Sequence, residues 1–341
     1  MIRATRAHPH LSIAEPVLHV VDEPGENRFA QDVHAGLRAT PKALPSMYFY
    51  DAIGSDLFRR IMEVPEYYLT RSEREILERH GADLASPFAG TPVDVVDLGA
   101  GDGVKTRVLF DGLRRQGARV RYFPVDVSVA ALEELLQGLS SDLPALHAEG
   151  VAAEYTNAIK WLSERAPDRR RFVLFLGSNV GNLDDATRGR FFSSLRGALR
   201  PGDYVLVGFD LVKDPETLCR AYDDAGGVTA EFNMNLLRRI NRELGADFRT
   251  SGFRHYATFS PQRSTMESHL LSLRRQTVHL EGIAYEFEPW EPMHVEISCK
   301  YRESDSADFA RDAGFVEEAR FFDERHWFMD ALWRVPGSSA T

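Results

Sequence analysis

The stretch VDVVDLGAGDGVKT, residues 93–106, decides which fold the sequence predicts. Its first half is mostly apolar, which predicts a buried strand, and this strand is followed by Gly99, Gly101 and Gly103. Glycine adopts positive φ angles easily and lets backbone N–H groups come close to a ligand. A helix beginning near Lys105 would point its N-terminus, which attracts anions, at the same place. The stretch therefore predicts a strand, a ligand-binding loop and a helix.

The spacing of the glycines distinguishes two kinds of ligand. The nicotinamide dinucleotide motif G-x-G-x-x-G needs a third glycine at the position that Val104 occupies. The chain instead has G-x-G-x-G, with Asp97 two residues before the first glycine. This variant resembles the S-adenosylmethionine loop of Rossmann-like methyltransferases. A turn with only a structural role is the alternative.

Composition and charge favour a globular protein with a small-molecule ligand. The chain has 341 residues, which is enough for two domains of about 150 residues each. Its net charge of -10 argues against nucleic acid as the main partner. Residues 1–27 have no continuous apolar core, which argues against a secretory signal and a membrane anchor. We expect a cytoplasmic monomer.

Cysteine and histidine spacing does not favour a metal site. Cys219 and Cys299 are far apart and have no C-x-x-C spacing, so we expect two buried apolar residues rather than a disulfide or a zinc site. The histidines that remain as an alternative metal site are His255, His269, His279 and His294. No pair of them has the i, i+4 spacing of ligands on a helix, and we expect no metal.

The residues before the loop predict a lead-in followed by helices. Residues 1–28 are polar and contain several prolines, and we expect them to be a poorly ordered lead-in. The pattern from Phe29 onward is typical of a short helix. Further on, Thr70 precedes Glu73 by three residues, which predicts a capping box at the start of another helix.

Polar residues end the two strands that follow the glycine loop. Residues 119–128 predict a strand ending in Asp126, about 25 residues beyond the glycines, where dinucleotide folds bind ribose hydroxyls. A helix N-cap is the competing role, but we favour ribose because the acid and the glycine loop occur together. The next strand, around residues 151–155, ends in Glu154 and Tyr155, which suit the amino group and the ring face of adenine.

Residues 172–176 are fully apolar, which predicts the central fourth strand of a doubly wound sheet. Ligands bind at the carboxyl ends of such strands, near the topological switch point. Small residues from Gly177 onward leave room there. From turn chemistry, Asn182 fits the turn before the next helix better than a ligand contact. A fifth strand follows Pro201 and Gly202.

The alternation of strands and helices stops at about Val212. Two helical stretches come first, with Tyr222 on the first of them. Alternating runs then predict a small antiparallel sheet over residues 268–273, 277–280 and 294–301. A helix over residues 304–313 and a strand pair, residues 315–324 and 326–335, complete the chain.

These elements predict an α/β fold of five βα units, an insertion, and a final helix and strand pair. Rossmann-like class I methyltransferases finish their sheet with an antiparallel hairpin in this way, and the chain resembles them. The resemblance implies a domain of residues 71–212 and 301–341 that binds S-adenosylmethionine. It leaves residues 29–70 and 213–300 as a smaller inserted α+β domain that binds the substrate.

Seven motifs together resemble one family within this class, the L-histidine Nα-methyltransferases of ergothioneine biosynthesis. The resemblance covers roughly residues 29–335 and implies trimethylation of histidine to hercynine with three molecules of S-adenosylmethionine. The motifs are YFYDAIGSDLF, PEYYLTRSEREIL, LGAGDGVKT, FLGSNVGN, AYDDAGGVTAEFN, NRELGADF and EISCKY.

The resemblance implies which residues bind the backbone of the amino acid substrate. Tyr67, Asn182 and Tyr222 would hold its carboxylate and α-amino group, with Gly177 nearby. Asn182 would also orient the reacting lone pair, with Tyr67 as the second catalytic residue. Phenols and an amide can bind a carboxylate without placing a fixed positive charge next to the sulfonium.

The resemblance also implies which residues bind the side chain and the cofactor. Glu296 and Ser298, on one face of a strand, would bind the imidazole, and Tyr50 would lie beside it. Ser268 stands where other members have a methionine in the substrate pocket. The cofactor contacts would be Tyr67, Gly99 and Lys105 at the methionine end, Asp126 at the ribose, and Glu154 and Tyr155 at the adenine.

Two other functions remain open from the sequence. The serine at position 268 leaves room for a different amino acid substrate, such as tyrosine or tryptophan. A nicotinamide-dependent oxidoreductase is the alternative from another class, and Val104 argues against it.

Overall fold

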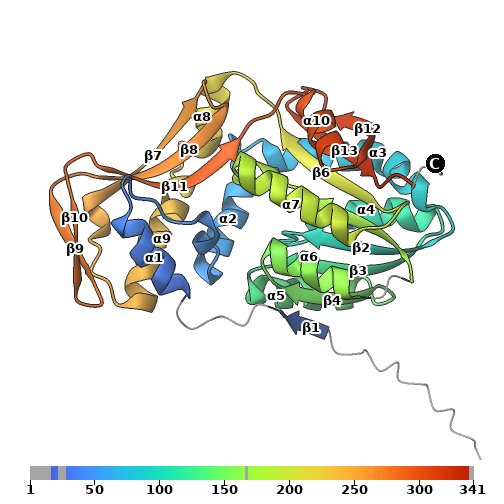
Figure 1. Cartoon of the computed structure of the whole chain (residues 1–341), viewed down its shortest axis with the longest axis horizontal. Coiled ribbons are helices and arrows are strands. Elements are labelled where there is room, and N and C mark those ends of the chain that lie inside the picture. Colours follow the sequence, from blue (N-terminus) through green and yellow to red (C-terminus); the bar gives the residue numbers. More distant parts are fainter. Residues whose placement is uncertain (1–16, 22–27, 166–167, 338–341) are drawn as a thin grey trace, which may run out of the picture.

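The computed structural model describes residues 17–21, 28–165 and 168–337, and it confirms the predicted α/β fold (Figure 1). The predicted lead-in therefore lies mostly outside the described residues. The largest sheet has eight strands in the order β1-β4-β3-β2-β5-β6-β13-β12. Two smaller sheets, with the orders β11-β8-β7 and β10-β9, belong to the second part of the molecule.

The apolar run that precedes the glycines forms β2 (Pro92–Leu98), a central strand of the large sheet. Val93 and Val95 join one hydrophobic core, whereas Val96 and Leu98 join another on the opposite face of the sheet. Burial on both faces explains why the run is nearly continuous. β2 pairs in parallel with β3 (Arg119–Asp126) and β5 (Arg170–Phe175). The parallel sheet continues with β4 (His147–Ala152) beside β3 and β6 (Tyr204–Asp210) beside β5.

Helices cover both faces of this sheet, as a doubly wound fold requires (Figure 1). Those on one face are α3 (Leu69–Ala85), α4 (Val104–Arg115) and α5 (Val129–Asp142). Those on the other face are α6 (Tyr155–Glu164), α7 (Asp185–Ala198) and α10 (Asp305–Asp312).

The end of the chain forms the predicted antiparallel hairpin. β13 (Phe328–Arg334) pairs antiparallel with β6, and β12 (Val316–Phe322) pairs antiparallel with β13. This reversal at one edge of an otherwise parallel sheet is the feature that the sequence analysis predicted. At the opposite edge, β1 (Val17–Val20) pairs parallel with β4. This strand was not predicted, because its four residues fall within a polar, proline-containing segment.

A second part of the molecule combines residues that precede β2 in the chain with residues that follow β6. Helices near the N-terminus and elements after β6 share one hydrophobic core, which includes Val33, Phe49, Leu237 and Leu270. The helices of this core are α1 (Arg28–Arg38), α2 (Ala52–Glu63) and α9 (Val228–Leu244). The strands are β7 (Phe253–Ser260), β8 (Thr265–Ser272), β9 (Gln276–Leu280), β10 (Ile283–Phe287) and β11 (Pro292–Cys299). α8 (Pro215–Tyr222) packs in a neighbouring core with residues of α3, β8 and β13.

Two of the three runs predicted to form a small antiparallel sheet do pair with each other. β8 pairs with β11, as predicted for residues 268–273 and 294–301. Residues 277–280 instead lie in β9, which pairs only with β10 in a separate hairpin. The remaining short helices are η1 (Ser46–Phe49), η2 (Ser86–Phe88), η3 (Asn179–Asn182) and η4 (Thr250–Gly252). Within the described ranges, no helix is long and apolar enough to cross a bilayer.

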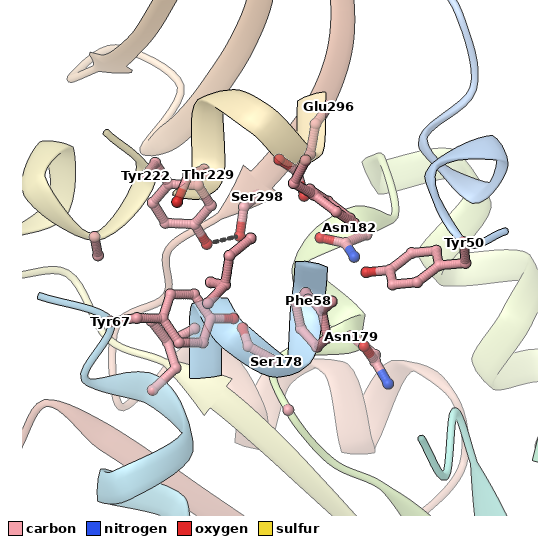
Figure 2. A pocket seen from close by; sticks show the side chains of 15 residues that line it. Tyr50, Phe58, Tyr67, Ser178, Asn179, Asn182, Tyr222, Thr229, Glu296 and Ser298 are labelled. Carbon is pink, nitrogen blue, oxygen red and sulfur yellow. Dashed lines mark hydrogen bonds between the residues drawn. The ribbon is translucent and has the colours of Figure 1, made fainter. Parts of the chain in front are cut away.

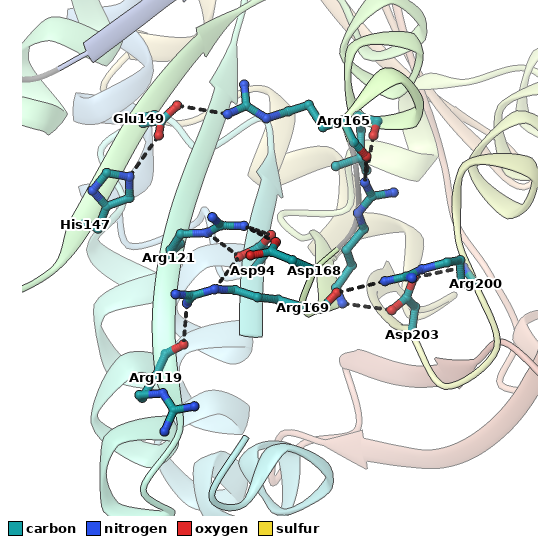
Figure 3. A network of polar contacts seen from close by, with 12 residues as sticks. Asp94, Arg119, Arg121, His147, Glu149, Arg165, Asp168, Arg169, Arg200 and Asp203 are labelled. Carbon is teal, nitrogen blue, oxygen red and sulfur yellow. Dashed lines mark hydrogen bonds and ion pairs between the residues drawn. The ribbon is translucent and has the colours of Figure 1, made fainter. Parts of the chain in front are cut away.

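A polar network ties together the amino ends of the central strands, away from the glycine loop (Figure 3). Asp94 of β2 accepts hydrogen bonds at 2.8 and 2.7 Å from Arg121 of β3. Asp203 accepts one at 2.8 Å from the backbone N–H of Arg171. The buried Arg171 guanidinium donates to the carbonyl oxygens of Ala198 and Leu162, at 2.7 and 2.8 Å.

We expect the substitution Arg171→Met to lower the free energy of unfolding by about 2–4 kcal/mol, because it removes the buried hydrogen bonds that the guanidinium donates to backbone carbonyl oxygens. Arg119→Met, at an exposed position of β3, is the control and should change it by less than about 0.5 kcal/mol. Urea denaturation of the two variants measures the difference. Equal stabilities would contradict a structural role for the buried guanidinium.

Candidate active site

A cavity lies beyond the carboxyl end of β5, at the predicted switch point, where the sheet domain meets the second part of the molecule (Figure 2). It contains about 500 Å³ of space not filled by atoms, its open mouth included. Seven of the predicted substrate residues line it: Tyr50, Tyr67, Gly177, Asn182, Tyr222, Glu296 and Ser298. The structure therefore brings together residues that are up to 248 positions apart in the chain.

The ends of short elements hold these side chains in place. Tyr222 is the last residue of α8, and its backbone oxygen lies 2.9 Å from Nε2 of the buried His255. Asn182 is the last residue of η3, so it occupies the turn position that the sequence also allowed and lines the cavity as well. Glu296 and Ser298 reach the cavity from alternate positions of β11, as predicted for one face of a strand.

Ser268 lies behind the cavity wall rather than in it. Its buried hydroxyl donates a hydrogen bond of 3.1 Å to Oε2 of Glu296, from the paired strand β8. Ser268 is not among the residues that line the cavity, so its contact with the substrate stays a prediction. Its hydrogen bond orients the Glu296 carboxylate. Burial raises the pKa of Glu296, and the Ser268 hydrogen bond acts in the opposite direction.

The glycine loop has the backbone geometry that its sequence predicts. Gly99, Gly101 and Gly103 have φ angles of +80°, +53° and +66°. A Cβ at Gly99 would lie 2.5 Å from the side-chain nitrogen of Asn179, and the φ angle of +80° is one that other residues rarely adopt, so the position favours glycine. Asn179 also lines the cavity and was not predicted, because its neighbours read as a simple turn.

Asp126 faces the glycine loop and is not the cap of the following helix. Its two carboxylate oxygens accept hydrogen bonds from the backbone N–H groups of Gly101 and Ser128, at 3.1 and 3.0 Å. Ser128 is the N-cap of α5 and accepts from Ala131, so the capping role is already filled. Each oxygen keeps acceptor capacity, and the residue fits the binding of ribose hydroxyls.

Lys105 and Glu73 connect the loop to the cavity. Glu73 is fully buried, forms an ion pair with Lys105 of α4, and accepts the Gly177 N–H at 2.6 Å. The predicted capping box of Thr70 and Glu73 is wrong. The helix begins one residue earlier, at Leu69, without a side-chain cap, because Glu73 points inward to Lys105 and Gly177. Glu73 therefore contributes to the site, although its spacing from Thr70 predicted only a helix cap.

Of the two predicted adenine residues, Tyr155 lies beside the same loop. A Cβ at Gly99 would meet the Tyr155 hydroxyl at 2.9 Å, and the Tyr155 ring packs edge-on against Phe175. Glu154 precedes α6 and forms an ion pair with Arg28 of α1. The loop, an acceptor for ribose and an aromatic wall are thus adjacent, and they fit S-adenosylmethionine.

The four histidines that were the alternative metal site have other surroundings. His255 contacts the Tyr222 backbone, and His279 contacts Asp247 at 3.0 Å. The rings of His269 and His294 are 5.3 Å apart. In the part of the chain that the structure describes, no group of three or more His, Cys, Asp or Glu side chains is arranged to hold a metal ion.

The reversed sheet edge, the G-x-G-x-G loop and the adjoining cavity define a class I S-adenosylmethionine-dependent methyltransferase. Residues 29–335 match the model of the histidine-specific, SAM-dependent methyltransferases. The chain belongs to this family, which excludes the nicotinamide-dependent oxidoreductase.

Curated relatives agree with this assignment. The histidine N-alpha-methyltransferase of Mycobacterium tuberculosis is 41% identical over 286 residues, which cover 83% of this chain and 88% of that protein. The enzyme of the same name from Mycolicibacterium smegmatis is 40% identical with the same coverage. The 4-dimethylallyltryptophan N-methyltransferase of Claviceps fusiformis is 30% identical over 226 residues, 64% of this chain and 62% of that protein.

We expect Gly99→Ala to weaken binding of S-adenosylhomocysteine by about tenfold or more, because the new methyl group meets Asn179 and the φ angle of +80° strains any other residue. Isothermal titration calorimetry measures the affinity. Gly189→Ala, in α7 with open space around the new methyl group, is the control and should bind normally. Unchanged binding by both variants would exclude the loop as the cofactor site.

Proposed function

We propose that this protein transfers three methyl groups in succession from S-adenosylmethionine to the α-amino group of L-histidine, which gives hercynine for ergothioneine biosynthesis. The observation that carries the proposal is the family match, together with Glu296 and Ser298 in the cavity beside the glycine loop. The protein would be a cytoplasmic monomer. Residues 29–70 and 213–300 would form the domain that binds the substrate.

The amino acid backbone would be held at one end of the cavity. Tyr67, Asn182 and Tyr222 would bind the carboxylate and the α-amino group beside Gly177. Burial raises the pKa values of the Tyr67 and Tyr222 hydroxyls well above the ordinary value for tyrosine. Both phenols therefore stay neutral at physiological pH. Tyr222 donates its proton to Ser298 Oγ, so it would face the substrate as an acceptor for the α-amino group.

The imidazole would be held at the other end. Glu296 would accept a hydrogen bond from a ring N–H group, and Tyr50 would lie beside the ring. Burial also raises the pKa of the Tyr50 hydroxyl, so this residue is a neutral aromatic surface. The carboxylate of Glu296 is the group that distinguishes imidazole from an apolar aromatic side chain.

The cofactor would lie along the glycine loop, where it would supply a methyl group on a positively charged sulfur. Gly99, Lys105 and Tyr67 would contact its methionine end, Asp126 would bind the ribose, and Glu154 and Tyr155 would flank the adenine. The Lys105 ammonium is already paired with Glu73, so a carboxylate would meet a lysine that is fixed in position.

Catalysis would depend on position rather than on a general base. Methyl transfer needs a neutral amine in line with the methyl group, with the reacting atoms about 3–3.5 Å apart. Asn182 would orient the lone pair of the amine, and the proton would leave to water before attack. The faces of Tyr50 and Tyr67 would stabilise the growing ammonium by cation–π attraction through three rounds.

Mass spectrometry of reactions with each of the twenty amino acids tests the substrate. We expect histidine to gain three methyl groups and the other amino acids to remain unchanged, because only histidine offers an imidazole N–H to Glu296. Methylation of tyrosine or tryptophan with histidine inert would favour the alternative substrate instead.

Glu296→Ala should raise the dissociation constant for histidine by about 30-fold or more, because it removes a charge-assisted hydrogen bond in a buried site. The affinity for S-adenosylhomocysteine should change by less than about twofold. Glu286→Ala, at an exposed position of β10, serves as the matched control. Equal loss of both affinities in the Glu296 variant would contradict the proposed role.

A further inference from the structure

A fully buried lysine lies directly behind the cavity. Lys300 follows Glu296 and Ser298 at intervals of two residues, just after β11. Its Nζ atom is 2.7 Å from the Tyr222 hydroxyl oxygen, 2.8 Å from Ser298 Oγ and 2.8 Å from an Asp210 carboxylate oxygen. An ammonium group has three N–H donors and no acceptor, so these three contacts use all of its donors.

The contacts of Lys300 determine what the Ser298 hydroxyl can do. Tyr222 donates a hydrogen bond to Ser298 Oγ at 2.7 Å (Figure 2). Lys300 donates to the same oxygen. A serine oxygen has two lone pairs, and both are then occupied. Ser298 can therefore act toward the cavity only as a donor.

Glu296 is the complementary group on the same face of β11. Its carboxylate accepts from Ser268 on one oxygen and has no proton to donate when it is ionised. The strand thus presents an acceptor at position 296 and a donor at position 298 to one cavity. A ring that carries one N–H group and one unprotonated nitrogen satisfies both, and neutral imidazole is such a ring.

We propose that Lys300 is a positioning residue that makes Ser298 an obligate hydrogen-bond donor, so that Glu296 and Ser298 together select a neutral azole side chain. This inference rests on the proposed function, because histidine is the amino acid that brings such a ring. Lys300 itself touches neither substrate nor cofactor and acts through Ser298 and Tyr222.

A second buried lysine provides a matched control. Lys213 also forms an ion pair with Asp210, but its other contacts are the Tyr68 hydroxyl and the Leu211 carbonyl oxygen. None of these groups is among the cavity-lining residues. When Lys300 is replaced, Lys213 still neutralises Asp210, so the variant does not leave an unpaired buried charge.

The test compares histidine with β-(pyrrol-2-yl)alanine and β-(pyrrol-3-yl)alanine, which keep a ring N–H and lack the second ring nitrogen. Dissociation constants are measured by calorimetry in the presence of S-adenosylhomocysteine. We expect the wild-type protein to prefer histidine to the better analogue by about 30-fold, and both Lys300→Met and Ser298→Ala to reduce this preference by about tenfold. Lys213→Met should keep the preference.

A purely structural role for Lys300 would weaken all three ligands equally and leave the preference unchanged, which would overturn the proposal. If Lys300→Met does not fold, Ser298→Ala decides, because retention of the full preference by that variant also overturns it. Failure of the wild-type protein to bind histidine would instead contradict the proposed function. The two failures are therefore distinguishable.

Discussion

The carboxylate of Glu73 is the contact on which the rest of the site depends. One oxygen pairs with Lys105, at the start of the helix that follows the glycine loop, and the other accepts the N–H of Gly177 in the cavity wall. A buried carboxylate is stable only when it is paired and hydrogen-bonded, so Lys105 and Gly177 must both stay in place. One side chain thereby fixes the glycine loop and the cavity wall relative to each other.

A second buried anion, Asp210, fixes the positions of side chains behind the cavity. Asp210 ends β6 and accepts from Tyr68, Lys213 and Lys300. The sequence suggested that the site avoids a fixed positive charge near the sulfonium. The structure instead places the Lys300 charge one layer behind Tyr222, where Asp210 neutralises it. Lys300 thus orients the hydroxyl groups of Tyr222 and Ser298 at the cavity, and its own charge is neutralised by Asp210.

The sequence predicted the sheet and the cofactor loop well because both follow from local patterns. Apolar runs bounded by turns define β2 and β5, and the spacing of Gly99, Gly101 and Gly103 implies positive φ angles. The pairing of β9 with β10 was missed because register in short, exposed strands depends on neighbours that are distant in sequence. β1 was missed because its four residues fall within a polar, proline-containing segment.

Site residues that act through a second residue were harder to predict. Glu73 matched a capping pattern, and only its burial against Lys105 reveals its role. Ser268 matched a pocket position by resemblance, but a shorter side chain ends behind Glu296. Lys300 continues the alternation of Glu296 and Ser298, so that signal was present in the sequence. Its meaning required knowledge that Asp210 and Tyr222 converge on the same point.

The shared core of the N-terminal helices and the elements after β6 has a consequence for synthesis on the ribosome. α1 and α2 emerge first, yet their apolar faces pack against residues from Phe232 onward. At ordinary translation rates this partner arrives on the order of ten seconds later. The cofactor-binding strands are made in between and can begin to pair. Nascent chains therefore expose the apolar faces of α1 and α2 throughout that interval.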